Sequence, residues 1–379
     1  MLRQFFSLCF ALSFMATLPA QIVSTLLTKP GQHFEGITWA KSGEIYVVDF
    51  VTGQGFELTT DGQITEIGRG NGALGGTVDE KGNFYYSEFN TGNILKIDTA
   101  KNQTIYCSGL IGPAGILIDE ENQIMYVANY SGNSISKIDM AAETIQATIL
   151  ASGGLINGPD GLVFDPDGNI ISANFNNNNI QRITPEGEVT RFATISSSPN
   201  SGYIVRRDDQ YIIAGAASPN IYSISLEGEV RQIAGTGVVG YQDGEAAQAQ
   251  FNLPNGVALS PSGDTLILTE SSTDGRIRLL TNFDLTNTIA IEQTFEQVHL
   301  SPNPASDQIN LKMNLKKAAD LTINLIQFNG TVVDTLTTTQ ASKGIFERQI
   351  MLPSNLDAGI YLVQIVAEDQ VYYEQLVKQ

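Results

Sequence analysis

Histidine is nearly absent from this chain, which has only His33 and His299 among its 379 residues. Two histidines exclude a zinc site built from several imidazoles. A Ser-His-Asp triad would have to use His33, and no nucleophile elbow accompanies it. Catalysis by a histidine dyad is excluded in the same way. A metal-dependent mechanism with oxygen ligands needs no histidine and remains open.

Cysteine and long apolar runs are also scarce. The chain has Cys9 and Cys107. Arg3, the mostly apolar residues 5–18 and the small Ala20 are typical of a secretory signal peptide spanning residues 1–20. Cys9 would leave with that peptide, so we expect no internal disulfide and a buried, unreactive Cys107. No other stretch is long and apolar enough to cross a bilayer, so we expect the mature protein to be soluble.

Positive charge is the third deficit, with 21 Lys and Arg against 40 Asp and Glu and a net charge of −19. This imbalance argues against nucleic acid and anionic membranes as partners and is compatible with cations or neutral sugars. Most of the acidic residues need no further explanation than the solubility of an exported protein.

What the chain does have is a short phrase, one residue and a glycine followed by an apolar segment, that recurs six times. We assign the shared glycine to Gly36, Gly76, Gly115, Gly161, Gly202 and Gly256, with spacings of 40, 39, 46, 41 and 54 residues. A period near 40 with several short strands per unit is typical of a β-propeller. We therefore predict an all-β protein in which residues 21–284 form a six-bladed β-propeller.

The sixth repeat lacks a fourth strand after Leu280. We predict that Ile22–Leu27 supplies it and so closes the ring. Residues 285–297 are predicted to form a polar linker. Residues 298–379 lack the phrase and show alternating segments that predict a small antiparallel β-sandwich.

The residue before each shared glycine forms the first candidate ring around the propeller axis. Its members are Glu35, Gly75, Ala114, Asp160, Ser201 and Asn255. Three of them, Glu35, Asp160 and Asn255, can bind a cation through oxygen; the alternative is that they line a water-filled tunnel. A second ring at the ends of the second strands could hydrogen-bond the following loops or meet a ligand: Asp49, Glu88, Asn129, Asn174 and Glu270.

Two further motifs are interpreted structurally. The spacing Gly235, Gly237, Gly240 matches a dinucleotide fingerprint, but no helix is expected after it, so we predict no nucleotide cofactor. Residues 165–169 resemble the start of an EF-hand loop but lack its later acidic ligand, so we interpret them as a hairpin turn.

Parts of the propeller resemble known families. Residues 234–244 with 251–259, followed by Arg276-Ile277-Arg278, resemble the NHL repeat. Glu35-Gly36-Ile37-Thr38-Trp39 resembles the opening of the regucalcin/gluconolactonase (SMP-30) family. That resemblance implies a divalent cation such as Ca²⁺ held by Glu35, Asp160 and Asn255. This chain departs from the family by having Ile37 in place of proline and by placing Asp160 before Asn255.

The C-terminal unit resembles the type IX secretion sorting domain of Bacteroidetes. The four matching segments, in the family's order, are residues 300–307, 329–333, 356–362 and 376–379. The resemblance implies that residues 298–379 bind the type IX secretion machinery. The protein would then pass through the periplasm and be secreted or held at the cell surface. The alternative is a sandwich that binds carbohydrate.

Two functions compete at this point. The first is an extracellular binding scaffold for a small molecule, a glycan or a protein, which the altered ligand order favours slightly. The second is a metal-dependent lactone or ester hydrolase of the gluconolactonase type, in which a cation polarises a carbonyl and activates water. The sequence singles out no catalytic residue beyond the three candidate ligands.

Overall fold

The computed structural model describes residues 20–195, 200–216, 219–282, 295–327, 332–367 and 370–379. Residues 1–19 of the predicted signal peptide and residues 285–294 of the predicted linker lie outside these residues. The last part of the linker, residues 295–297, belongs to the first strand of the C-terminal unit. Among the described residues, no helix is long and apolar enough to span a membrane.

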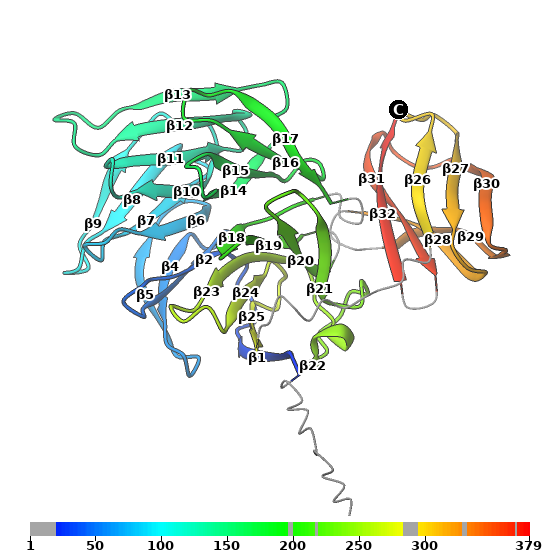
Figure 1. The fold of residues 1–379 in the computed structure, drawn as a ribbon, viewed down its shortest axis with the longest axis horizontal. Helices are drawn as coiled ribbons and strands as arrows, with labels where there is room; N and C mark the ends of the chain where they lie inside the picture. Colours follow the sequence, from blue (N-terminus) through cyan, green and yellow to red (C-terminus); the bar gives the residue numbers. More distant parts are fainter. Residues whose placement is uncertain (1–19, 196–199, 217–218, 283–294, 328–331, 368–369) are drawn as a thin grey trace, which may run out of the picture.

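The propeller consists of six antiparallel sheets arranged around one axis, which confirms the predicted all-β, six-bladed fold (Figure 1). The first three blades are β2 (Phe34–Trp39), β3 (Ile45–Asp49), β4 (Gln54–Leu58) and β5 (Ile64–Arg69); β6 (Ala73–Val78), β7 (Phe84–Glu88), β8 (Asn93–Ile97) and β9 (Gln103–Cys107); and β10 (Pro113–Asp119), β11 (Ile124–Asn129), β12 (Ser134–Asp139) and β13 (Ala147–Ser152).

The next two blades are β14 (Pro159–Phe164), β15 (Ile170–Asn174), β16 (Asn179–Ile183) and β17 (Val189–Thr194); and β18 (Ile204–Arg207), β19 (Gln210–Gly215), β20 (Asn220–Ser225) and β21 (Val230–Ala234). The sixth contains β23 (Pro254–Leu259), β24 (Leu266–Glu270) and β25 (Arg276–Thr281). The short strand β22 (Gly244–Glu245) belongs to the same sheet, and the short 3-10 helix η1 (Ala246–Gln248) follows it.

The core of the propeller lies between neighbouring blades. The second strands β3, β7, β15 and β24 are buried along their whole length, because each is covered on both faces. Tyr46 and Val48 of the first blade, for example, pack against Phe84 and Tyr86 of the second. The Cys107 thiol is buried at the end of β9 and burial raises its pKa, as expected of an unreactive core residue.

The N-terminal strand β1 (Ile22–Thr28) closes the ring, as predicted. It pairs antiparallel with β25, from Ile22 opposite Thr281 to Thr28 opposite Arg276 (Figure 1). The buried Arg278 fastens this seam, with Nη1 donating to Glu270 Oε1 at 2.8 Å and Nη2 to Asp243 Oδ1 at 2.7 Å. The first strand of the propeller thus completes the sheet that contains its last three strands. The ring is therefore closed without an open gap between blades.

Each shared glycine lets the inner strands of two blades approach closely at the axis. A Cβ on Gly36 would lie 2.7 Å from Leu74 O, and one on Gly161 would lie 2.6 Å from Ile204 N. The same backbone approach recurs at Gly75, Gly115, Gly202 and Gly256, each facing the next blade. In five blades the inner strand also carries a register shift at the phrase.

The register corrects the sequence alignment in the second blade. The shift lies between Ala73 and Gly76, so Gly75 is the shared glycine and Leu74 is the residue before it. We had placed both one residue too late, because the tandem Gly75-Gly76 fits either alignment. Leu74, and not Gly75, is therefore the second blade's member of the inner ring.

The fifth blade differs from the others. Its inner strand β18 begins only at Ile204 and pairs with β19 without a register shift. Tyr203 reaches the axis here, since a Cβ on Gly75 of the second blade would lie 2.7 Å from the Tyr203 hydroxyl. The Tyr203 side chain therefore reaches the axis, which the sequence did not predict, while Gly202 faces Asn255 of the sixth blade.

The second candidate ring serves the loops. Asp49 Oδ1 accepts from Thr52 N at 2.6 Å and from Thr52 Oγ1 at 2.7 Å, and Glu88 Oε1 accepts from Asn71 N at 2.9 Å. Asn129, Asn174 and Glu270 are likewise buried and hydrogen-bonded. The hairpin interpretation of residues 165–169 also holds, because Asp165 Oδ1 accepts from the backbone of Asp167 and Asn169.

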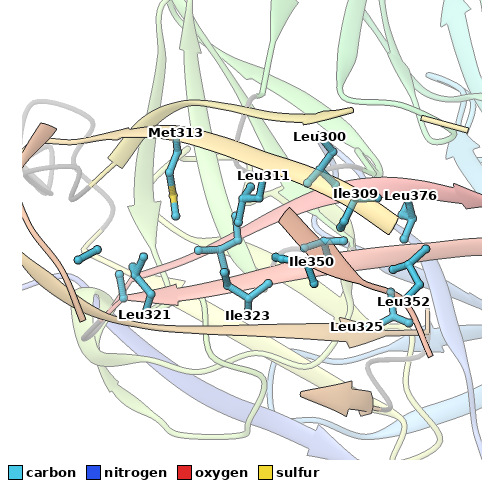
Figure 2. Close-up of a cluster of buried hydrophobic side chains, with 14 of the residues drawn as sticks. Leu300, Ile309, Leu311, Met313, Leu321, Ile323, Leu325, Ile350, Leu352 and Leu376 are labelled. Atoms are coloured by element: carbon cyan, nitrogen blue, oxygen red, sulfur yellow. The ribbon is translucent and has the colours of Figure 1, made fainter. Parts of the chain in front are cut away.

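The C-terminal unit is made of two antiparallel sheets. One contains β26 (Phe295–Ser301), β27 (Gln308–Leu315) and β30 (Gly344–Met351); the other contains β28 (Ala319–Ile326), β29 (Val332–Ala341), β31 (Gly359–Ala367) and β32 (Gln370–Lys378). Side chains such as Leu311, Ile323 and Ile350 meet in one apolar core (Figure 2). Alternation of buried and exposed residues along β27 and β28 produces this core.

We predict that Gly36→Ala destabilises the propeller by roughly 1–3 kcal/mol or more, because the new methyl would meet backbone atoms that cannot move aside independently. Gly55→Ala is the matched control, since its nearest neighbour would be Tyr86 Cε1 at an ordinary 3.6 Å. Urea denaturation measures both variants. Equal stabilities for the two variants would contradict the argument.

Candidate functional site

A cavity of about 740 Å³ opens on the propeller axis and is lined by residues of all six blades. The lining side chains are Glu35, Phe50, Leu74, Phe89, Tyr130, Asn157, Asp160, Phe175, Asn176, Asn200, Ala216, Leu253, Asn255 and Ser271, with Ile360 of the C-terminal unit. The three candidate ligands predicted from the sequence all line this cavity. Gly75, Ala114 and Ser201, the other predicted members of the inner ring, do not.

Glu35 and Asn255 are joined directly. Asn255 Nδ2 donates to Glu35 Oε2, and Ser271 Oγ donates to Glu35 Oε1. The Glu35 backbone carbonyl also accepts from Thr269 Oγ1, so the first blade is tied to the sixth at this point. The amide of Asn255 thus turns its nitrogen toward Glu35, and its Oδ1 is buried without a hydrogen-bond partner.

Asp160 stands beside this pair on the fourth blade. Its side chain is 3% exposed, and its Oδ1 is also buried without a hydrogen-bond partner. The Tyr203 hydroxyl lies near enough to lower the pKa of the Asp160 carboxyl, although it makes no hydrogen bond of good geometry. We call Glu35, Asp160, Tyr203, Asn255 and Ser271 the polar cluster.

Burial governs the electrostatics of the polar cluster. It raises the pKa of Glu35 to about 7, against the opposing effect of hydrogen bonds from Ser271 and Asn255. It raises the pKa of Asp160 to about 8, with a further contribution from the charge of Glu35. The pKa of Tyr203 lies well above its ordinary value for the same reasons. At neutral pH two buried carboxyl groups therefore compete for protons.

The polar cluster is poor in the residues that form dense metal sites. Within the described residues, no group of three or more His, Cys, Asp and Glu comes together as a metal site would require. The cluster instead combines two carboxylates with one amide oxygen, a phenol and a hydroxyl.

Sequence reasoning missed Tyr203 and Ser271. Tyr203 escaped notice because the fifth blade lacks the register shift that aligns the others. Ser271 follows the second strand of the sixth blade, at the place where the first four blades have Phe50, Phe89, Tyr130 and Phe175. Comparing the residue after each second strand would have shown the four aromatic residues and the presence of Ser271 in their place in the sixth blade.

The comparisons with known proteins agree with this architecture. Residues 19–204 match the family profile described as SMP-30/gluconolactonase/LRE-like region, and residues 299–379 match the secretion system C-terminal sorting domain. No curated protein sequence matches the chain.

Several solved structures share the propeller fold. A protein of unknown function from Bacteroides thetaiotaomicron has 17% identity and a TM-score of 0.59, over 69% of this chain and 76% of that one. A gluconolactonase from Xanthomonas campestris has 12% identity and a TM-score of 0.54, over 70% and 92%. Virginiamycin B lyase from Staphylococcus aureus has 19% identity and a TM-score of 0.52, over 68% and 98%.

The chain thus combines a gluconolactonase-like β-propeller with a C-terminal sorting domain. The propeller carries the SMP-30/gluconolactonase-like region, and the sandwich is the sorting domain of a cargo protein of the type IX secretion system. This sorting domain indicates export to the cell surface or secretion.

We predict that Asp160→Asn makes the folding stability of the cation-free protein less sensitive to a rise in pH. The raised pKa means that the folded state holds the Asp160 proton more tightly than the unfolded chain does. The resulting stability is fully present below about pH 4 and is lost as the pH rises through about 8.

In EDTA, the melting temperature of the wild type should therefore fall relative to that of Asp160→Asn between pH 5 and pH 8, by on the order of several degrees. Thermal melts at fixed ionic strength measure the difference. Parallel curves for the two proteins would show that Asp160 does not titrate in this range.

Proposed function

We propose that the propeller is an extracellular, divalent-cation-dependent hydrolase of lactones or esters. The observation that carries the proposal is the pair of buried acceptor oxygens, Asp160 Oδ1 and Asn255 Oδ1, which have no hydrogen-bond partner and belong to residues that line one cavity with Glu35. Buried polar atoms are normally satisfied, so unsatisfied acceptors on cavity-lining residues point to a ligand that supplies positive charge.

The donor set suits a hard cation. Glu35, Asp160 and Asn255 would hold it through carboxylate and amide oxygens, which Ca²⁺ and Mg²⁺ prefer. Positive charge there would also relieve the cost of burying two carboxylates, the cost that otherwise raises the pKa of Glu35 and of Asp160. Ca²⁺ is the first cation to test.

A bound cation would polarise a substrate carbonyl and lower the pKa of water. The protein's own groups fix the surroundings of that reaction. Asn255 and Ser271 orient the Glu35 carboxylate, and Tyr203 stands beside Asp160. In the hydrolysis, water adds to the carbonyl carbon, the bond from that carbon to the ring or ester oxygen breaks, and a proton passes from the water to the departing oxygen.

The gluconolactonase-like region supports this proposal, because the first blade's Glu35 phrase lies within the matched residues. A binding scaffold without catalysis is the second candidate. It is favoured by the small number of titratable groups in the polar cluster and by the order of Asp160 and Asn255. A scaffold would hold its ligand in the same cavity and leave it unchanged.

We predict that the protein treated with EDTA binds Ca²⁺ in calorimetry and that Asp160→Asn weakens binding by at least roughly a hundredfold. Loss of an outer partner of a metal ligand already costs about 10–100-fold, and a direct ligand should cost more. Hydrolysis of a panel of lactones and aryl esters should fall in parallel.

Glu88→Gln is the matched control. Glu88 is a buried acid of the second ring, but it serves a loop and does not line the cavity. This variant should bind Ca²⁺ as the wild type does. If the wild type binds none of Ca²⁺, Mg²⁺, Mn²⁺ and Zn²⁺, the hydrolase proposal fails and the scaffold remains.

The sorting domain yields a separate prediction. A chain lacking residues 298–379 should fold its propeller, because all six blades are built from earlier residues, yet it should accumulate in the periplasm. Cell fractionation and immunoblotting measure its location. Wild-type amounts of the truncated protein outside the cell would contradict the assignment.

A further inference from the structure

Four aromatic side chains form an arc along one side of the cavity. Phe50, Phe89, Tyr130 and Phe175 each follow the second strand of blades one to four. Neighbouring ring centroids lie 5.8, 5.8 and 5.9 Å apart, from Phe50 to Phe89, to Tyr130 and to Phe175. We call these four residues the aromatic arc.

The other side of the cavity is different. At the same position the fifth and sixth blades have the small residues Ala216 and Ser271. The aromatic arc thus covers four consecutive blades and ends where the fifth begins. All four aromatic side chains are only half-buried, so part of each ring surface is accessible from the cavity.

Hydrogen bonds anchor the aromatic arc. Each member directly follows a residue of the second ring, whose side chain bonds the adjoining loop or, for Asn129, Ser134 and Ser136 of the next strand. The Tyr130 hydroxyl donates to Asn176 Oδ1 at 2.6 Å, and Asn176 Nδ2 donates to Asn157 Oδ1 at 3.3 Å. The Tyr130 hydroxyl, the Asn176 amide and Asn157 Oδ1 are therefore engaged with one another.

The aromatic arc adjoins the polar cluster. The charge of Asp160 acts on the Tyr130 hydroxyl and, after burial, contributes to raising its pKa. Both groups line the same cavity. A ligand in this cavity would therefore meet carboxylates at one part of its surface and aromatic rings at another.

We propose that the ligand of this cavity carries an apolar ring beside its carbonyl group, as an aryl-substituted lactone does, and is not a polyhydroxylated sugar lactone. This inference rests on the proposed function for the carbonyl and adds the chemistry of the ligand's body. Aromatic walls favour ring stacking and edge contacts. A polyol would need many hydrogen-bond partners, and part of this wall is already engaged, because Tyr130 donates to Asn176 Oδ1 and Asn176 Nδ2 donates to Asn157 Oδ1.

The test uses lactams, which mimic lactones and are not turned over. A phenyl-substituted γ-lactam and gluconolactam are titrated into the full-length protein with Ca²⁺ present, and binding is followed by calorimetry. We expect the phenyl lactam to bind at least about tenfold more tightly. Phe89→Ala should bind the phenyl lactam roughly tenfold more weakly than the wild type does. Phe89→Leu should lose a similar amount, and it is measured in case the alanine variant is unstable.

Two controls accompany the test. Tyr130→Phe keeps the ring and should retain most of the affinity. Tyr241→Ala removes an aromatic side chain outside the cavity and should change nothing. Equal or tighter binding of gluconolactam, an unchanged affinity in both Phe89 variants, or no binding of either lactam overturns the proposal.

The outcome is separable from the hydrolase proposal. If no lactone is hydrolysed but the phenyl lactam still binds and both Phe89 variants lose affinity, the apolar-ring site stands and the cavity belongs to a scaffold. If lactones are hydrolysed and gluconolactam binds best, the hydrolase stands and the apolar-ring site falls.

Discussion

The close approach of six inner strands at the axis is the constraint on which the rest of the structure depends. Glycine at positions such as Gly36 and Gly161 removes the Cβ that would collide with the next blade's backbone. Close-packed interiors do not absorb such a collision cheaply. Because the strands meet there, residues that are 125 and 220 positions away from Glu35 in the sequence, Asp160 and Asn255, line one cavity.

The same constraint explains why the site is chemically unusual. Strands packed this tightly exclude water from their side chains, and burial is the first cause of the raised pKa of both Glu35 and Asp160. Placing two acids there costs stability that a wholly apolar ring would not cost. Leu74 and Ala114 show that apolar residues are accepted at equivalent positions in the second and third blades. The acids are therefore not required by the fold.

Much of this architecture could be predicted from the sequence, because the glycine phrase repeats for a steric reason. The strand boundaries, the closure by Ile22–Thr28 and the convergence of Glu35, Asp160 and Asn255 on one cavity follow from it. The errors arose in the second and fifth blades, where the steric requirement for one glycine does not fix the alignment. Gly75-Gly76 offers two glycines for one position, and the inner strand of the fifth blade has no register shift, so the approach of Tyr203 to the axis did not follow from the phrase.

Hydrogen-bond partners and side-chain packing across blades lay beyond sequence reasoning. The second ring illustrates this: the sequence left loop hydrogen bonds and ligand binding open as alternatives, and the structure shows that oxygens of Asp49 and Glu88 accept from loop donors. Asp160 Oδ1 and Asn255 Oδ1 lack such donors. Glu270 combines both conditions, since its Oε1 accepts from Asn252 and Arg278 while its Oε2 is buried without a hydrogen-bond partner. What separates the candidate site from the loop anchors is therefore the combination of unsatisfied oxygens with a place on the cavity lining, and neither feature alone.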